Sequence, residues 1–248
     1  MHTRRSVRLD DEAPGVVLDW DTEFWGVRIG RVVAEELTEE RLQDVDRWAD
    51  ELGLACVYYL APGTDAASAH VAESGGFRLM DLRVELRRDA APTPRSRGVR
   101  EALPADRERL REIAAGSHGV TRFYADPHFP DERCDLLYAT WIERSLEGWA
   151  ATVLVAERDG EPVGYCSCHL DQPKAVGSIG LIAVDEDARG GGVGLALASA
   201  AVDWCAANGA RTMSVVTQGR NAGALRTFQR AGFLVSSIDL WFHKWYDR

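Results

Sequence analysis

The stretch Ile182-Ala-Val-Asp-Glu-Asp-Ala-Arg-Gly-Gly-Gly-Val-Gly194 decides the fold of this chain. The apolar run 179–184 is typical of a β-strand, and the segment after Gly194 has the apolar spacing of a helix, carried by Leu195, Ala198, Val202 and Cys205. The glycines therefore stand where a strand passes into a helix. Glycine lets several backbone N–H groups close around an anion, and the positive end of the helix dipole adds to the attraction. The sequence thus indicates a phosphate-binding turn.

Two common phosphate motifs do not fit this turn. A Walker loop needs Gly-Lys-Ser/Thr, which the stretch lacks. A dinucleotide-binding turn belongs to the first βαβ unit and precedes an acid by about 20 residues. Here the turn comes late in the chain, and Asp203 follows too soon and inside the helix. Glycines also make ordinary turns and helix caps, so the neighbouring segments have to decide.

The pattern Arg189-x-x-Gly192-x-Gly194, preceded by Ile182-Ala183-Val184, resembles the acyl-coenzyme A motif of the GCN5-related N-acetyltransferases (GNAT). The next strand, 213–217, and the helix 221–233 with its Ala-Gly-Phe ending follow the order of that family. The resemblance implies an α/β (mixed α+β) GNAT fold, in which helices flank a central mixed, largely antiparallel twisted sheet. It also implies acetyl-CoA as co-substrate. The coenzyme-binding residues that it implies are Ile182, Ala183, Val184, Arg189, Gly190, Gly191, Gly192, Val193, Gly194, Asn221 and Phe228.

Composition excludes several classes of protein. The formal charge of −10 argues against nucleic-acid binding, which needs clustered Lys and Arg. No apolar run approaches 18 residues, so we expect no membrane span. Met1-His-Thr-Arg-Arg is followed by acidic residues and not by an apolar segment, so we expect no signal peptide and a cytoplasmic location. The resemblance leaves room for a homodimer through edge strands.

The five cysteines lack the paired spacing of a zinc site or a disulfide framework, so we expect no metal and buried, reduced thiols. Cys166-Ser-Cys168-His169 is the one suggestive cluster. Its cysteines alternate along a predicted strand and have no second Cys/His pair at finger-like spacing. A structural role is the favoured interpretation of this cluster.

A Pro-rich stretch, 89–98, divides two apolar-periodic halves and predicts a linker between domains 1–88 and 99–248. Residues 45–88 also match 201–244 at a constant offset of 156, with Trp48 on Trp204 and Gly76-Phe77 on Gly232-Phe233. The pattern predicts that the first domain is a degenerate half-GNAT copy. Its counterpart of the Gly-rich turn carries Glu residues, whose carboxylates repel a pyrophosphate. We therefore expect one active site, in the second domain.

Several segments resemble GNAT enzymes that acetylate the amine of a nucleotide-linked deoxysugar. They are Leu18–Gly26, Thr121–Pro130, Trp141–Arg144 and the run from Thr217 to Leu225. The resemblance implies a small-molecule amine as acceptor, most readily such an amino sugar. The loop 121–130 has the aromatic and cationic mix that stacks on a base and pairs with a diphosphate. Its candidate substrate-binding residues are Arg122, Phe123, Tyr124 and His128, which could equally pack against the sheet.

The general acid is where the sequence departs from the family. A Tyr seven residues after the Asn usually protonates the departing thiolate, and this chain has Phe228 there. Tyr165 is the candidate we name as catalytic, with Cys168, His169, Tyr124 and His128 as further options and solvent as the alternative. The acids Asp171, Asp185, Glu186 and Asp187 are interpreted as solvated residues and not as a base.

Three functions remain open from the sequence. The first is an acyl-CoA-dependent N-acetyltransferase acting on a small amine. The second is an acyl-CoA-binding sensor or partner subunit whose catalysis was lost with the Tyr. The third is an N-acetyltransferase whose acceptor is a protein N-terminus or an antibiotic-like amine. All three predict coenzyme binding at Arg189–Gly194.

Overall fold

The computed structural model describes residues 13–91 and 98–247, and the chain divides into two compact units. Unit 1 is Met1–Met80 together with Asp239–Arg248, and unit 2 is Asp81–Ile238. These boundaries differ from those expected at residues 88 and 99. The reason is that strands β4 (Arg78–Asp89) and β10 (Leu234–Trp245) each begin in one unit and end in the other. Residues 92–97 of the predicted linker lie outside the described residues.

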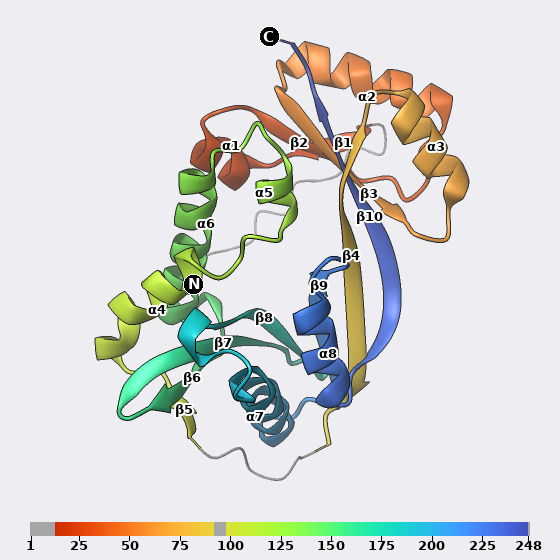
Figure 1. Ribbon diagram of the computed structural model, residues 1–248. Helices are drawn as coiled ribbons and strands as arrows, with labels where there is room; N and C mark the ends of the chain where they lie inside the picture. Colours follow the sequence, from red (N-terminus) through yellow and green to blue (C-terminus); the bar gives the residue numbers. More distant parts are fainter. Residues whose placement is uncertain (1–12, 92–97, 248) are drawn as a thin grey trace. The chain divides into compact units, whose positions relative to one another are not determined.

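Unit 1 is built on the strand order β1-β2-β3-β10 (Figure 1). β1 and β2 are antiparallel, β2 and β3 are parallel, and β3 and β10 are antiparallel. Helix α2 starts at the side-chain cap of Thr38, and α3 starts at that of Asp65. A separate core gathers around Val45, Tyr59 and Phe242. The complete elements of unit 1 are β1 (Gly15–Val17), α1 (Asp19–Trp25), β2 (Ile29–Val32), α2 (Glu39–Leu52), β3 (Cys56–Pro62) and α3 (Ala66–Ser74).

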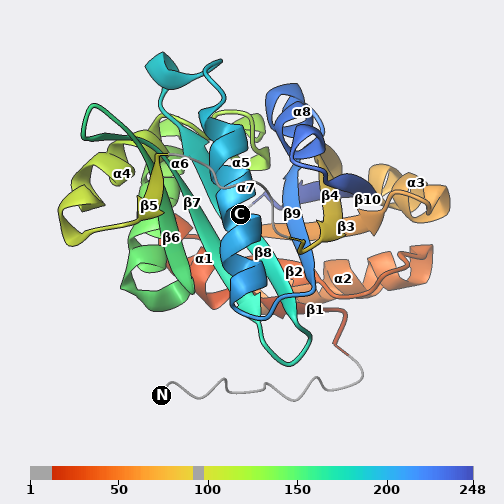
Figure 2. The ribbon, with the colours of Figure 1, turned by 90° about the horizontal axis from the view of Figure 1, so that it is seen from below.

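Unit 2 has the strand order β4-β9-β8-β7-β6-β5, with β8 and β9 parallel and the other neighbours antiparallel (Figure 2). Its strands are β5 (Val99–Glu101), β6 (Thr152–Arg158), β7 (Glu161–Asp171), β8 (Val176–Val184) and β9 (Thr212–Gln218). Its helices and helical turns are η1 (Pro104–Asp106), α4 (Arg107–Ala115), α5 (Arg122–Ala125), α6 (Asp131–Arg144), η2 (Ser145–Trp149), η3 (Glu186–Ala188), α7 (Val193–Ala207) and α8 (Ala222–Arg230). This mixed sheet flanked by helices confirms the predicted fold class.

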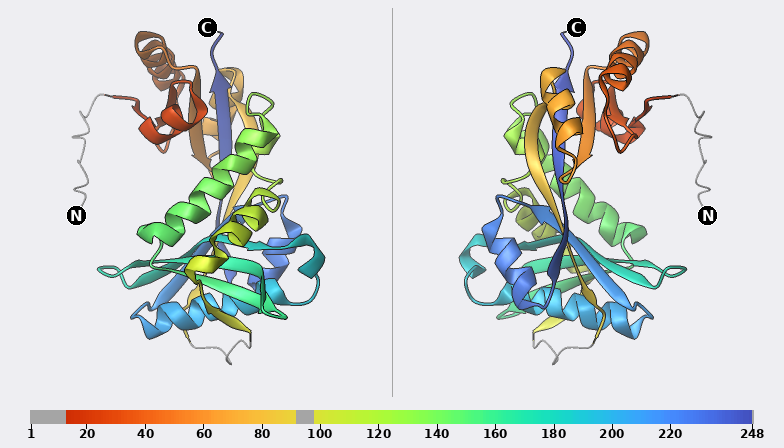
Figure 3. Two further views of the ribbon diagram at one scale, coloured as in Figure 1. Left: turned by 90° about the vertical axis from the view of Figure 1, so that its left-hand side faces the viewer. Right: turned by 90° about the vertical axis from the view of Figure 1, so that its right-hand side faces the viewer.

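Alternation along β7 assigns its side chains to two layers. Cys166 and Cys168 are buried in the core beneath α7, together with Leu197 and Ala198. Tyr165, the residue before Cys166, lies on the opposite face, where its hydroxyl is 3.2 Å from His118 Nε2. Helix α4 packs against β7, and α6 packs against α4 (Figure 3). The strand therefore separates an apolar thiol-containing core from a more polar face.

The internal offset of 156 residues recurs in the structure. Adding it to the bounds of β3, α3 and β4 gives the bounds of β9, α8 and β10. The helix caps correspond as well. Asp65 accepts a hydrogen bond from the Ser68 N–H, and Asn221 accepts one from the Ala224 N–H. The two halves therefore share a local design down to the cap that starts the equivalent helix.

Each copy pairs its last strand with the other copy. β4, which ends the first copy, pairs with β9, and β10 pairs with β3. The two registers are equivalent under the offset, because Arg83 lies opposite Gln218 and Asp239 opposite Pro62. This exchange of strands explains why the compact units cut the chain inside β4 and β10.

The first copy fills the place where the second has its Gly-rich turn. Ser68 Oγ accepts a hydrogen bond from the Leu37 N–H at 2.8 Å, and the Tyr59 hydroxyl donates to the Glu35 carbonyl at 2.8 Å. The first turn of α2 carries Glu39 and Glu40. Carboxylates next to this helix start disfavour a phosphate there, and the assignment of the first copy as degenerate stays a prediction.

Candidate functional site

The Gly-rich turn connects β8 to α7 in unit 2. Gly190 and Gly192 have φ of +80° and +84°, and Gly192 is the residue that caps the 15-residue helix α7. The space where a Cβ would lie is open at both glycines for 4 Å. Without side chains at these glycines, an anion could approach the backbone N–H groups closely, next to the positive end of α7. This geometry suits a phosphate or pyrophosphate.

Ion pairs and backbone contacts fix the segment in front of the turn. The Asp185 carboxylate accepts from the Asp187 N–H at 3.0 Å and forms an ion pair with Arg109 of α4. The Arg189 Nε donates to the Val184 carbonyl at 3.1 Å. Asp185 therefore helps to order the turn and is not merely a solvated acid, which differs from the expectation from sequence.

Strand β8 leaves its neighbour just before it reaches the turn. Its pairing with β9 ends at Ile179 and Val215, although β8 continues to Val184 and β9 to Gln218. The register with β7 also shifts here, and the Leu181 N–H donates to Ser167 Oγ at 2.8 Å. The fork leaves the backbone of Ile182, Ala183 and Val184 facing an open space. A strand edge of this kind can bind an extended polar chain by main-chain hydrogen bonds.

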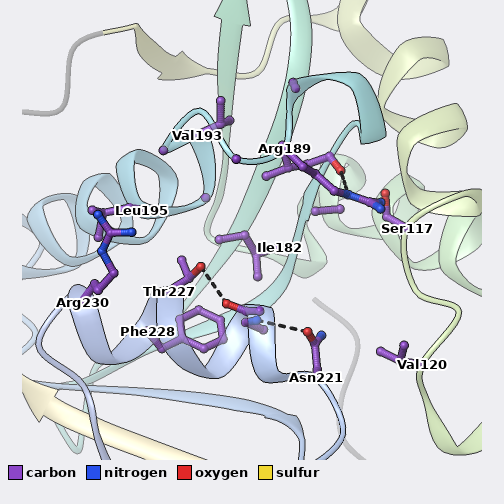
Figure 4. A pocket seen from close by; sticks show the side chains of 18 residues that line it. Ser117, Val120, Ile182, Arg189, Val193, Leu195, Asn221, Thr227, Phe228 and Arg230 are labelled. Carbon is purple, nitrogen blue, oxygen red and sulfur yellow. Dashed lines mark hydrogen bonds between the residues drawn. The ribbon is translucent and has the colours of Figure 1, made fainter.

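Helix α8 forms the opposite wall of the fork. Asn221 Oδ1 accepts from the Ala224 N–H at 3.1 Å, which starts the helix, and Thr227 and Phe228 follow on the lining face (Figure 4). The Phe228 side chain is 1% exposed and packs edge-on against Phe233, with ring centroids 6.0 Å apart. Phe228 thus contributes apolar surface and no acidic proton to the wall.

The turn, the fork and α8 enclose one cavity of about 440 Å³, within the range of small-molecule sites. Every predicted coenzyme-binding residue except Gly191 lines it. A Cβ on Gly191 would instead lie 3.5 Å from the Arg158 guanidinium. The lining residues that we did not predict are Ser117, Val120, Ala188, Leu195, Gly223, Ala224, Thr227 and Arg230. The loop containing Ser117 and Val120 gave no sequence signal, because it reaches the cavity only through the tertiary fold.

Tyr165, the candidate acid, lies outside this lining. Its side chain is fully buried, opposite Ala183, and its hydroxyl lies 3.2 Å from Nε2 of His118. Burial raises the pKa of Tyr165. Burial, together with the nearby Arg189 charge, lowers the pKa of His118 to about 4. The two rings therefore form a neutral pair. An acid role for Tyr165 stays a prediction, and this environment does not favour it.

The candidate substrate-binding residues of the loop 121–130 also lie outside the lining of the cavity. Phe123 is buried against Phe129, with ring centroids 5.6 Å apart, and Arg122 lies over its ring at 4.1 Å. The Tyr124 hydroxyl donates to Asp135 at 2.5 Å, and His128 Nδ1 lies 2.8 Å from Asp126 Oδ1. These side chains thus contact one another within the loop and, through Tyr124, helix α6, and substrate binding stays a prediction.

Asp81 is a charged residue that the sequence analysis missed. It is 4% exposed, and its Oδ1 lies 3.6 Å from Nε of Arg220, next to Asn221. Burial raises the pKa of Asp81, while the charges of Arg220 and Arg122 act in the opposite direction. Only the pairing of β4 beside β9 brings this residue near Asn221, so no local pattern could have indicated it.

The remaining candidates have structural surroundings. Cys166, Cys168 and Cys205 are buried together, and the hydrogen bond with Cys168, together with burial, raises the pKa of Cys205. No group of three or more His, Cys, Asp or Glu side chains suited to a metal occurs in 13–91 and 98–247. Over the same residues, no helix combines the length and apolar character that crossing a membrane requires.

A model of the acetyltransferase (GNAT) family matches residues 110–233, half of the chain, and covers the turn, the fork and α8. The chain belongs to the acetyltransferase (GNAT) family. The predicted family is thereby confirmed. The GCN5-related N-acetyltransferase from Sphaerobacter thermophilus superposes with a TM-score of 0.65 at 20% identity, over 93% of this chain and 76% of that one, which shows the shared fold.

Curated relatives of this GNAT chain are acetyltransferases and a polysaccharide biosynthesis protein. It is 27% identical to the dTDP-fucosamine acetyltransferase of Escherichia coli over 92% of this chain and 96% of that protein. It is 38% identical to the mycothiol acetyltransferase of Sanguibacter keddieii over 39% of this chain, and 27% identical to the spore coat polysaccharide biosynthesis protein SpsD of Bacillus subtilis over 57% of it. The chain spans 33% and 48% of the lengths of these last two proteins.

Proposed function

We propose that this protein is an acyl-CoA-dependent N-acyltransferase that moves an acetyl group from acetyl-CoA to the primary amine of a small molecule. The observation that carries the proposal is the cavity in which the Gly190–Gly192 turn, the open edge of β8 and Asn221 meet. These groups suit three successive parts of acetyl-CoA. The turn would hold the pyrophosphate, the β8 edge the pantetheine amides, and Asn221 the arm near the thioester.

The acceptor we favour is an amino sugar linked to a nucleotide. The relative named dTDP-fucosamine acetyltransferase matches almost the whole of both chains, including the first copy, which the family model does not cover. The alignments with the mycothiol acetyltransferases cover 39% or 73% of this chain and 33% or 60% of those proteins. Similarity over the full length supports an acceptor like that of the first relative, because the acceptor side of the fold is formed outside the coenzyme motif.

The reaction makes three demands on the site. The amine has to become neutral, the thioester carbonyl has to be polarised, and the thiolate has to leave. Backbone groups at the β8 fork can polarise the carbonyl. The ring of Phe228 has no acidic proton, and the Tyr165 hydroxyl is engaged with His118. We propose that solvent protonates the thiolate, which is a fair leaving group without an acid.

A second function follows from Phe228. If the missing Tyr marks a lost activity, the protein binds acyl-CoA as a sensor or partner subunit and turns nothing over. The same cavity supports both functions, and only chemistry distinguishes them. An enzyme whose acceptor is a protein N-terminus is the third option.

The test is a thiol-release assay with acetyl-CoA and a panel of nucleotide-linked amino sugars, polyamines, aminoglycosides and peptide amines. Mass spectrometry of the acceptor checks that release is coupled to a gain of one acetyl group. We expect saturable release with a nucleotide-linked amino sugar and at most slow release with the peptides. Acetyl-CoA binding without acetylation of any acceptor would support the sensor, and preference for peptides would support the third option.

A further inference from the structure

His169 lies at the point where the coenzyme strand separates from its neighbour. On β7 it alternates with the buried Cys168 and so shares the face of Ser167, opposite the α7 core. Across the strand pair it lies opposite Ser178 of β8. Pairing of β8 with β9 ends one residue later, at Ile179. The imidazole thus lies next to the point where β8 and β9 separate, outside the residues that line the cavity.

Gly180 is the first residue of β8 beyond the last pair with β9, and it makes room for this imidazole. A Cβ at Gly180 would lie 2.7 Å from His169 Cδ2 and 2.9 Å from Ser167 Oγ, and it would lie closer still to His169 Nε2. Any other residue would push the ring off the strand. Gly180 is nevertheless exposed, so the ring lies over backbone that solvent and an acceptor can reach. Nε2 of His169 therefore faces the strand at the open fork.

Trp149 holds His169 from the other side. Its indole packs edge-on against the imidazole with ring centroids 5.2 Å apart, and its backbone forms a hydrogen bond with the ring. The indole itself is 60% exposed. Exposed aromatic surface next to a partly buried imidazole suits a ring-shaped polar acceptor such as a sugar. His169 is thereby held by Trp149 while it stays partly exposed.

The surroundings keep His169 neutral. Burial lowers its pKa, and the Trp149 backbone offsets that effect only in part. Ser167 on its own strand, Ser178 and Gly180 on β8, and Trp149 from η2 supply no titrating side chain. Asp171, two residues further along the same strand, is paired with Lys174 at 2.9 Å. A neutral imidazole at pH 7 can accept a proton, as a base at this position must.

We propose that His169 is the catalytic base that removes a proton from the acceptor amine at the β8 fork. This inference rests on the proposed function. The acceptor ammonium gives one proton to Nε2 of His169, and the resulting lone pair attacks the thioester carbonyl. The C–N bond forms and the C–S bond breaks, which leaves an amide and the CoA thiolate. The second proton from nitrogen neutralises the thiolate through solvent, and His169 returns its proton to water.

The experiment compares the wild-type protein with His169→Ala and with His70→Ala, which removes an exposed histidine of α3 in unit 1. We expect His169→Ala to lower kcat by at least about 100-fold, the usual contribution of a general base. Its acetyl-CoA affinity by calorimetry should stay within about twofold, since one unchanged site holds the coenzyme. Added imidazole should restore part of its rate, and the acidic limb of the wild-type pH–rate profile should disappear. His70→Ala should match the wild type in all four measurements.

Two further variants keep the inference falsifiable if His169→Ala unfolds. His169→Gln fills the same place without a titrating group and should lose the same rate while keeping its melting temperature. Asp81→Asn removes the buried carboxylate near Asn221 and should keep the acidic limb. Full turnover in both His169 variants, or an acidic limb lost only with Asp81→Asn, would overturn the assignment. If the wild type acetylates no acceptor, the result contradicts the proposed function. Failure of the base assignment requires an active wild type whose His169 variants are equally active.

Discussion

The Tyr165 hydroxyl lies 3.2 Å from Nε2 of His118; Tyr165 is fully buried and His118 is partly buried. The His118 ring also stacks on Tyr138 of α6, with centroids 4.2 Å apart. The next residue back along the chain, Ser117, lines the cavity. The pair therefore ties the loop after α4 to the sheet and holds that wall in place.

Tyr165→Phe tests whether the pair is structural or chemical. The change removes the hydroxyl and leaves the His118 nitrogen buried without this partner, which costs about 1–3 kcal/mol of stability. We expect a lower melting temperature and a kcat within about threefold of the wild type, a barrier change under 1 kcal/mol. Calorimetric melting and the thiol-release assay measure the two effects. A large loss of kcat at an unchanged melting temperature would restore Tyr165 as the acid.

The buried His118 predicts a specific pH dependence of stability. Its pKa is about 4 in the folded protein and 6.5 without burial, so below pH 6.5 the unfolded chain binds a proton that the folded chain does not. Stability from this group is complete above pH 6.5, falls as the pH drops towards 4, and then levels off. The total change is about 3 kcal/mol.

His118→Gln keeps a hydrogen-bonding side chain and removes the titration. Between pH 7 and pH 4.5 we expect its melting temperature to fall less than that of the wild type. The titration of the carboxylates affects both proteins equally, so the difference reports on His118. Parallel curves for the two proteins would show that His118 is protonated in the folded state.

Asn221 and Asp65 offer a matched pair of caps, one in each copy. Each starts its helix by accepting an N–H three residues later, at 3.1 Å and 3.0 Å. Asn221→Ala should cost about 1 kcal/mol of stability, and Asp65→Ala should also lower the melting temperature. Only Asn221→Ala should weaken acetyl-CoA binding as measured by calorimetry, because only Asn221 lines the cavity. Equal affinities in the two variants would limit Asn221 to its capping role.

Phe228→Tyr tests the departure from the family pattern. If solvent protonates the thiolate, the new hydroxyl should change kcat by less than about tenfold, or under about 1.4 kcal/mol of barrier. The side chain is packed against Phe233, so a small loss of stability is expected as well. The thiol-release assay provides the rate. A gain well beyond tenfold would identify the present protein as an enzyme weakened by the loss of its acid.

The sequence could predict the parts of the site that are continuous along the chain. The glycines, the Ile182–Val184 strand and the Asn221 cap carry their signal in local spacing, and the structure brings them to one cavity. The offset of 156 was also readable, since matching glycines mark matching helix ends. Local chemistry determines where these elements start and stop.

Contacts between residues far apart in the sequence could not be predicted from local sequence patterns. His118 gave no signal in the sequence. It lies in an irregular segment after α4, and its partner, Tyr165, is 47 residues away. The exchange of β4 and β10 was also missed, because two copies with the same alternation can pair within or between themselves. For the same reason the unit boundaries differed from the composition-based ones.

The central claim is that the Gly190–Gly192 turn at the start of α7 holds acetyl-CoA, and calorimetric titration of acetyl-CoA tests it most directly. Gly192→Glu is compared with Gly209→Glu, which places the same side chain just beyond the other end of α7. Both glycines have positive φ, +84° and +92°, and open space around the Cβ position, so the strain is matched. We predict that Gly192→Glu weakens binding at least about 100-fold while Gly209→Glu binds like the wild type. Equal affinity in the two folded variants would contradict the assignment of the turn.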